Sequence, residues 1–262
     1  MIELGMGRRE LLTPLCADSR EVLVRAAMEG SMGRAFVPIL DAPSFCLIRV
    51  GAFSYLLGLP PHGAVSIDLY NTLCRECADT NIMPENTLWS GWLEKVFQGR
   101  FRTVSRYSLR VPEESFDAAL LRRCAEALPE GFSVRRFDAG LFSEALREEW
   151  SAPFVASFQD ALQYQQCGMG YAVLKGKQLV SGCSAYAFSR GMMEVEVATE
   201  KRFRRLGLAT CAAAHFLSDC MERKLRPNWD AANLASVGLA EKLGYLFERE
   251  YQVYQISVEE EP

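Results

Sequence analysis

The sequence predicts an α+β fold in two parts, with a smaller mixed domain followed by a more regular one. Segments of strand length alternate with helical segments along most of the 262 residues. Pro129 and Gly131 stand close together and end the preceding helix, which predicts a division into residues 1–130 and 131–262. An apolar fraction of 49% and a charged fraction of 24% are typical of a folded globular protein.

The first part has the weaker pattern, and we find no chemical motif in it. Apolar residues recur at helical spacing from Val22 and stop at Gly30, which predicts a helix. Two strands are expected next, over residues 45–50 and 52–57, with Gly51 between them. Further expected elements are helices over residues 69–78, 87–97 and 115–127 and a strand over residues 101–109.

The second part is more regular. Strands are expected over residues 132–137, 169–174, 178–188 and 192–199, and helices over residues 141–149 and 157–164. A long helix after residue 205 has one apolar face, formed by Leu206, Ala209, Ala213, Phe216, Leu217, Cys220 and Met221. A helix over residues 233–243 stops at Gly244, and an extended segment over residues 245–258 leads to an acidic tail. We find no internal repeat.

Composition and charge exclude several classes of protein. A net charge of −4 gives no reason to expect a nucleic acid or an anionic membrane as partner. No apolar run approaches the ~20 residues of a membrane helix, and the N-terminus lacks the order of a signal peptide. Nine cysteines, most in apolar or helical surroundings, indicate reduced thiols and a cytoplasmic location. Cys74 and Cys77 have CxxC spacing, but no second such pair exists, so we expect no metal site.

Residues 195–210 are the most informative segment, because they read as a strand, a short basic loop and the first turn of a helix. Gly207 and Ala209 leave room for an anion to approach the backbone, and Arg204 and Arg205 add positive charge there. A helix N-terminus presents unpaired N–H groups, so the segment predicts a phosphate site. A basic helix start without function is the alternative. A nucleic-acid patch is disfavoured, because the basic cluster is a single loop in an acidic chain.

A second element lies about thirty residues further on. Asn233 is placed to cap the helix that follows it. Together the pattern R-x-x-G-x-A at residues 204–209 and the run from Asn233 to Tyr245 resemble two motifs of the GNAT acetyltransferase superfamily. More narrowly, the chain resembles the zwittermicin-A-resistance-like subfamily, in WDAAN at residues 229–233, GMGY at 168–171, PENTLW at 84–89 and SRY at 105–107.

The resemblance implies a mainly antiparallel sheet whose strand over residues 195–199 splays from its neighbour. It also implies acetyl-CoA as cofactor, with the pantetheine arm along that strand and the diphosphate at the following turn. The residues so implied in cofactor binding are Val197, Ala198, Thr199, Arg204, Arg205, Leu206, Gly207, Leu208, Ala209, Thr210, Asn233 and Ser236. Asn233 and Ser236 would lie near the pantetheine or brace their helix.

Acetyl transfer to an amine needs a base to remove a proton from the nitrogen. Glu196 is the first candidate and Glu194 the second, because residues two apart on a strand share a face. An exposed strand face without a catalytic role is the alternative. In the superfamily a tyrosine often protonates the departing thiolate, but Ala240 stands at the matching position. Water, Tyr245, or unaided departure of the thiolate then remain.

We therefore expect an acetyl-CoA-dependent N-acetyltransferase acting on an amine of a small molecule, such as an aminated antibiotic, or of a protein. The alternative is a catalytically silent CoA-binding sensor or interaction module. The first part is expected to be an acceptor-side or accessory domain, and a homodimer is left open.

Overall fold

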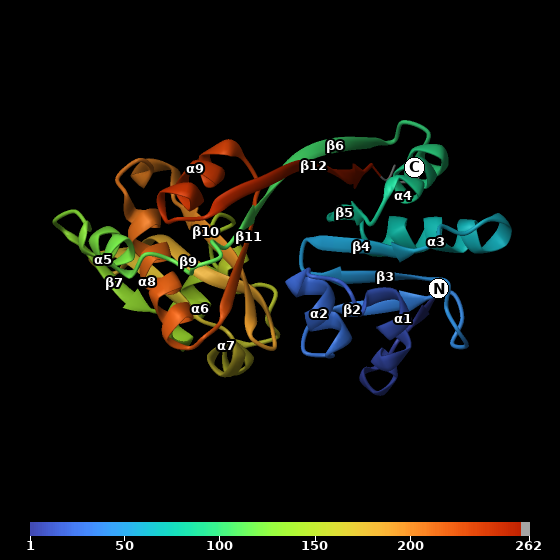
Figure 1. The fold of residues 1–262 in the computed structure, drawn as a ribbon, viewed down its shortest axis with the longest axis horizontal. Helices are drawn as coiled ribbons and strands as arrows, with labels where there is room; N and C mark the ends of the chain where they lie inside the picture. Colours follow the sequence, from blue (N-terminus) through green and yellow to red (C-terminus); the bar gives the residue numbers. More distant parts are fainter. Residues whose placement is uncertain (258–262) are drawn as a thin grey trace. The chain divides into compact units, whose positions relative to one another are not determined.

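The computed structural model describes residues 1–257, and the expected acidic tail after Val258 lies outside them. The chain forms two compact units (Figure 1). The first unit contains Met1–Arg106 and the stretch from Tyr251 onward, and the second contains Tyr107–Glu250. None of the helices in the described residues is both long and apolar enough to cross a bilayer.

The first unit contains a sheet in the order β1-β2-β3-β4-β5-β12. Neighbouring strands run antiparallel except β4 and β5, which are parallel and joined through α3. Buried aromatic side chains of α4, among them Trp89, Trp92 and Phe97, form much of the core. Along the chain, the elements as far as the passage into the second unit are β1 (Ile2–Glu3), η1 (Met6–Leu12), α1 (Thr13–Cys16), α2 (Val22–Met28), β2 (Arg34–Val37), β3 (Phe45–Val50), β4 (Phe53–Gly58), α3 (Gly63–Glu76), β5 (Asn81–Pro84), α4 (Thr87–Phe97) and β6 (Phe101–Arg110).

The second unit contains a sheet in the order β7-β8-β9-β10-β11-β6. Again one neighbouring pair is parallel, β10 with β11, and these two strands are joined through α8. The elements that follow β6 along the chain are α5 (Ala118–Glu126), β7 (Phe132–Arg136), α6 (Ala139–Ala145), η2 (Ala152–Phe154), α7 (Ala161–Cys167), β8 (Gly170–Lys175), β9 (Gln178–Ser189), β10 (Met192–Thr199), η3 (Lys201–Phe203), α8 (Leu208–Glu222), β11 (Arg226–Ala231), α9 (Leu234–Lys242) and β12 (Leu246–Ile256).

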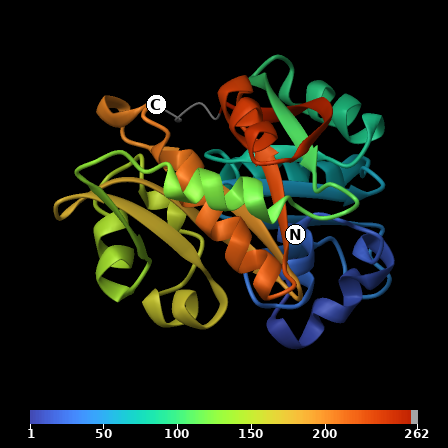
Figure 2. The same ribbon diagram turned by 60° about the vertical axis from the view of Figure 1, so that its left-hand side comes forward.

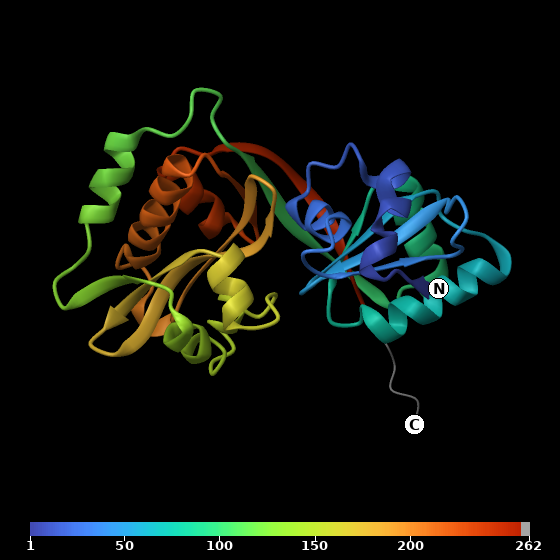
Figure 3. The same cartoon turned by 90° about the horizontal axis from the view of Figure 1, so that it is seen from below.

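Helices cover both faces of the second sheet. The long helix α8 contacts β8, β9, β10 and β11, and α5 packs on α8 (Figure 2). On the other face, the hydroxyl of Ser184 donates to the Phe154 carbonyl in η2 at 2.7 Å, and α6 and α7 lie on this side (Figure 3). The sheet is therefore covered on both sides, and β9 is buried along nearly its whole length.

The two units repeat one order of elements, although no repeat is visible in the sequence. Each has an edge strand, two short helices, three antiparallel strands, a helix, a parallel strand, a second helix and a last strand. The last strands are exchanged: β6 pairs with β11 in the second unit, and β12 pairs with β5 in the first. The first unit is thus a second copy of the same topology.

The division expected near residue 130 falls inside the second unit. Helix α5 belongs to that unit because it packs on α8, and the Cys211 thiol donates to the Ala125 carbonyl at 3.0 Å. The end of β12 belongs to the first unit, because Tyr254 pairs with Ile82. Proline and glycine near residue 130 mark the loop between α5 and β7 and not a domain boundary.

Two glycines at the start of β8 make room for a buried tyrosine. A Cβ on Gly168 would lie 2.7 Å from the Tyr164 ring, and a Cβ on Gly170 would lie 2.4 Å from the Tyr164 hydroxyl oxygen. That hydroxyl makes a 2.7 Å hydrogen bond with the hydroxyl of Ser184. The glycines of the GMGY motif therefore serve packing around Tyr164.

Candidate functional site

The parallel ladder between β10 and β11 opens after three residues. The pairing runs from Met192 to Glu194, and Glu194 lies opposite Asn228. Beyond Glu194, β10 stays paired with β9 as far as Thr199, whereas β11 turns to pair with β6. Within residues 1–257, the β11-side edge of β10 therefore has no strand partner from Val195 to Thr199. This is the splay that the family resemblance implied, and Val197, Ala198 and Thr199 lie on it.

The turn between β10 and α8 is open to a ligand. Gly207 has a φ of +79° and is the N-cap of α8, and a Cβ placed on it would meet nothing within 4 Å. No side chain of the described residues caps this helix, so its first N–H groups are free of an intramolecular side-chain acceptor. Leu206 is 45% exposed, while Leu208 is buried and anchors the helix beneath the turn. The predicted phosphate site is thus neither blocked nor packed away.

The turn carries uncompensated positive charge. Arg202 forms an ion pair with Glu200 at 2.6 Å, so these two charges cancel. The Arg204 Nε donates to the Thr199 carbonyl at 3.2 Å, which ties the loop to the end of β10. Across residues 1–257 neither Arg204 nor Arg205 pairs with a carboxylate. Two guanidinium groups and a helix N-terminus therefore favour an anion at one place.

The two candidate carboxylates of β10 have different surroundings, and the register of β9 and β10 shifts between them, after Glu194. Glu194 is 6% exposed, and its Oε2 accepts a 2.6 Å hydrogen bond from the Asn228 amide. Glu196 is half-buried and lies directly opposite Ser184 on β9. Glu196 faces the α6–α7 side of the sheet with Ser184, whereas Glu194 lies opposite Ala187, beyond a shift in the register of β9 and β10. Glu194 sits at the residue where the ladder opens, and Glu196 sits two residues into the open stretch.

Asn233 and Ser236 both brace α9. The Asn233 side chain accepts from the Ser236 N–H at 3.0 Å, which is the capping role expected of it. The Ser236 hydroxyl accepts from the Trp229 indole at 3.1 Å. Of the two roles that the resemblance implied for these residues, the structure shows the bracing one.

Tyr245 is a core residue, and its geometry argues against the role of proton donor expected for it. The side chain is 2% exposed, packs against Trp229 and Phe116, and donates to the Pro227 carbonyl at 3.1 Å. Burial above all, and then the nearby Cys220 thiol, raises the pKa of Tyr245 well above its ordinary value. Ala240, in the place of the superfamily tyrosine, is fully buried. We therefore do not carry Tyr245 forward as the acid.

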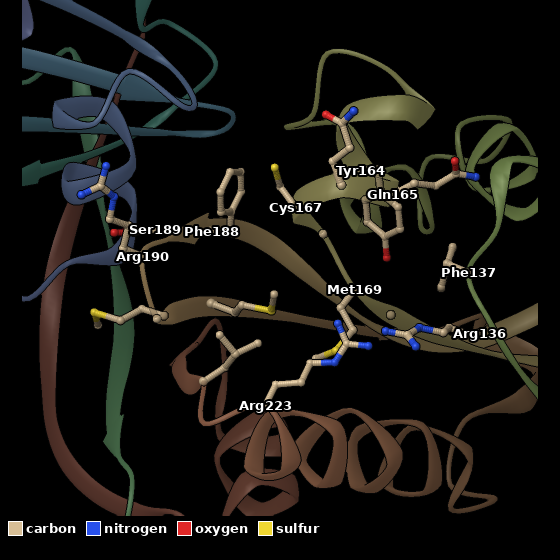
Figure 4. A pocket seen from close by; sticks show the side chains of 17 residues that line it. Arg136, Phe137, Tyr164, Gln165, Cys167, Met169, Phe188, Ser189, Arg190 and Arg223 are labelled. Carbon is tan, nitrogen blue, oxygen red and sulfur yellow. The ribbon is translucent and has the colours of Figure 1, made fainter.

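A pocket of about 430 Å³ lies at the other end of β10 (Figure 4). Met192 and Met193 line it together with Tyr164 and three arginines, Arg136, Arg190 and Arg223. Arg136 and Arg223 turn toward one another in Figure 4, and Asp219 pairs with both, at 3.0 and 2.6 Å.

No residue pattern predicted this pocket, because its lining comes from separate elements and carries no local motif. An eight-residue strand spans about 23 Å, so the pocket and the basic turn flank the two ends of β10.

Comparison with known proteins shows which family has a sequence and a fold similar to those of this chain. The family model described as GNAT acetyltransferase matches residues 13–254, which covers both units. The chain is similar to the uncharacterized N-acetyltransferase YdfB of Bacillus subtilis (strain 168), with 30% identity over 168 residues. That match covers 63% of this chain and 62% of the relative's length.

Solved structures are similar as well. A GCN5-related N-acetyltransferase-like protein from Streptococcus suis 89/1591 superposes with a TM-score of 0.86 and 33% identity, over 96% of this chain and all of that one. A tandem GNAT protein from the clavulanic acid biosynthesis pathway shares the fold, with a TM-score of 0.52 and 11% identity over 85% of this chain and 78% of its own. With its opened ladder, its cationic turn and a family match along nearly its whole length, this chain belongs to the GNAT acetyltransferase family.

Proposed function

We propose that this protein is an acetyl-CoA-dependent N-acetyltransferase that moves an acetyl group to an amine of a small molecule or of a protein. One observation carries the proposal: the unpartnered edge of β10 leads directly into an open, cationic helix N-terminus. A linear cofactor with a peptide-like arm and a diphosphate matches both parts. The arm hydrogen-bonds to a strand edge, and the diphosphate accepts from helix N–H groups.

The residues present fit this cofactor. The free space at Gly207 and the uncapped first turn of α8 suit a diphosphate, which the N–H groups from Arg205 to Thr210 would hold. Arg204 and Arg205 would add charge-assisted hydrogen bonds. Backbone groups of Val197, Ala198 and Thr199 would pair with the amides of the arm. When bound, acetyl-CoA supplies the acetyl group as an activated thioester.

Glu194 is the base in this proposal, ahead of Glu196, because its surroundings favour one orientation. The Asn228 amide donates to Glu194 Oε2 and fixes the carboxylate at the point where β10 and β11 part. A fixed carboxylate takes a proton from an amine at a defined position, which is what general base catalysis requires. A backbone N–H near Val197 would be placed to polarise the carbonyl of a bound acetyl group.

The pocket at the start of β10 is the acceptor side in this proposal. Met192 and Met193 line the pocket, and the next residue along the strand is Glu194. An amine held there would approach β10 from the end opposite to the diphosphate. Tyr245 is buried and Ala240 has no acid group, so the proton for the thiolate would come from solvent.

The test is release of free thiol from acetyl-CoA in the presence of a panel of amines, with the full-length protein. Polyamines, amino sugars, an aminated antibiotic and a lysine peptide cover the acceptor classes. We expect thiol release with at least one class, and loss of at least 100-fold in kcat for Glu194→Gln while the affinity for acetyl-CoA is kept. Glu196→Gln is the matched control, with a loss below 10-fold.

The alternative function, a CoA-binding sensor without catalysis, is favoured by one observation, the buried Ala240 at the usual tyrosine position. Tight binding of acetyl-CoA without thiol release for any amine would support that alternative. Absence of binding would overturn both functions.

The proposal also includes the subfamily, the cellular location, the partners and the oligomeric state. The zwittermicin-A-resistance-like subfamily is supported by the GMGY motif, whose glycines accommodate Tyr164, and it makes an aminated antibiotic one acceptor to test. The nine free cysteines support a cytoplasmic location. The basic turn is a single loop and does not call for a nucleic acid or a membrane as partner, and a homodimer is an arrangement to test by sedimentation.

A further inference from the structure

The first unit repeats the topology of the second but lacks its cofactor features. Strands β4 and β5 stay paired at four positions as far as Leu56 and Pro84, and the Glu85 N–H continues the ladder to the Leu56 carbonyl at 3.1 Å. The indole of Trp89, fully buried, donates to the Gly58 carbonyl at 2.8 Å and fills the space at the end of β4. Among residues 1–257, the β5-side edge of β4 therefore offers no open stretch like that of β10 for a pantetheine arm.

The turn before α3 also differs from the turn before α8. It contains Pro60 and Pro61, which have no backbone N–H, and it carries none of the arginines of the second unit. A diphosphate would therefore find neither the donors nor the charge that residues 204–210 provide. Within the described residues, the features that favour a diphosphate are therefore confined to the second unit.

A groove lies where the helices α3 and α4 flank that turn, with a volume of about 830 Å³. Its lining contains four large apolar side chains that are strongly exposed: Ile39 at 52%, Leu59 at 62%, Val65 at 41% and Leu88 at 60%. Such a cluster of exposed apolar groups around a concavity is unusual for a surface and marks a binding site. The volume falls in the range of sites for small ligands.

The charges of the lining indicate the class of ligand. Among the residues that line the groove, Lys95 and His62 are basic and none is acidic. Both side chains belong to exposed residues, so an anionic end could reach them from solvent. The Ser66 hydroxyl accepts from the Trp92 indole at 3.0 Å and adds a polar group at the groove wall.

We propose that this groove binds a small molecule with an apolar body and a single carboxylate, such as a medium-chain fatty acid. The apolar body covers Leu59, Val65 and Leu88, and the carboxylate lies at Lys95. The inference rests on the groove of the first unit and not on the acetyl-transfer function. Each added methylene that becomes buried should raise the affinity up to about fourfold.

The experiment is a calorimetric titration of the full-length protein with octanoate, decanoate, decanol and decylammonium, all below their aggregation concentrations. We expect decanoate to bind more tightly than octanoate by up to about 16-fold, and decylammonium to bind at least 10-fold more weakly than decanoate. Lys95→Gln should weaken decanoate five- to tenfold and leave decanol unchanged.

A matched pair of variants locates the site. Leu88→Glu places a carboxylate in the lining, and Ile67→Glu places one at a similarly exposed residue, 64% exposed, that does not line the groove. We expect Leu88→Glu to weaken decanoate at least 10-fold and Ile67→Glu to have no effect. Binding of acetyl-CoA should be unchanged in both variants, which shows that they fold and separates this test from the proposed function.

Four results would overturn the inference. They are no binding of decanoate at millimolar concentration, decylammonium binding as tightly as decanoate, equal effects of Leu88→Glu and Ile67→Glu, and a dimer in sedimentation that Leu88→Glu dissociates. The last result would mean that a second copy of the chain covers the groove.

Discussion

Replacing Gly207 with aspartate should strongly weaken binding of acetyl-CoA while the protein stays folded. The φ of +79° at this residue costs a non-glycine residue about 1 kcal/mol, and aspartate and asparagine tolerate this region best. A Cβ would meet nothing within 4 Å, so no clash adds to that cost. The fold should therefore lose only about 1 kcal/mol in either variant.

The loss of affinity follows from charge. A carboxylate placed about 5 Å from a phosphate charge costs on the order of 3 kcal/mol at an effective dielectric constant near 20, before screening by salt. Asparagine has the same shape and backbone cost but no charge. We expect Gly207→Asp to bind acetyl-CoA about 30- to 150-fold more weakly than Gly207→Asn, which corresponds to 2–3 kcal/mol.

Calorimetric titration at two salt concentrations measures this difference, and thermal unfolding of both variants provides the stability control. High salt should narrow the gap between aspartate and asparagine. If Gly207→Asp binds acetyl-CoA as tightly as Gly207→Asn does, then no anionic group approaches this turn, and the reasoning from helix N-terminus and charge fails.

Three further predictions concern stability and pH. Tyr245→Phe should cost about 1–2 kcal/mol of unfolding free energy, because the buried Pro227 carbonyl loses its donor, and should leave kcat unchanged; a large drop in kcat would restore Tyr245 as an acid. Gly170→Ala should cost about 1–3 kcal/mol in denaturant unfolding, since its Cβ would lie 2.4 Å from the Tyr164 hydroxyl oxygen, and an unchanged midpoint would show that Tyr164 is free to move. Burial lowers the pKa of His215, so the unfolded chain binds its proton more readily, and stability should fall as the pH drops below the ordinary value near 6.5. His215→Gln should flatten that fall, and an equally steep profile would assign it to other groups.

Residue patterns were sufficient to predict most elements of the fold. The expected strand over residues 192–199 and the expected helix over residues 87–97 have the same bounds as β10 and α4. The pattern failed where an element is short or atypical. Strand β5 has four residues that include Asn81 and Pro84, both rare in strands, and its place is set by pairing with β4. Helix α3 begins six residues earlier than expected, because its exposed first turn has no apolar periodicity.

In the candidate site too, features within one local motif could be predicted, and features that depend on contacts between distant segments could not. The open cationic turn could be predicted, because Arg204 and Gly207 lie within one local motif. The partner of Glu194 could not, because Asn228 reaches it only through the parallel pairing of β10 with β11. The role of Tyr245 could not be predicted either, because its burial depends on side chains from β11 and from the loop before α5. The repeat of topology was invisible for a related reason: the two units share element order but not the motif that marks the second.

Hydrogen exchange measured by mass spectrometry, with and without CoA, tests the central claim most directly. The account predicts slower exchange for the amides of residues 195–210, where β10 has no strand partner and α8 begins. It predicts no change for residues 59–66, the equivalent turn of the first unit, which serves as an internal control. Unchanged exchange at residues 195–210, or protection at residues 59–66 instead, would contradict it.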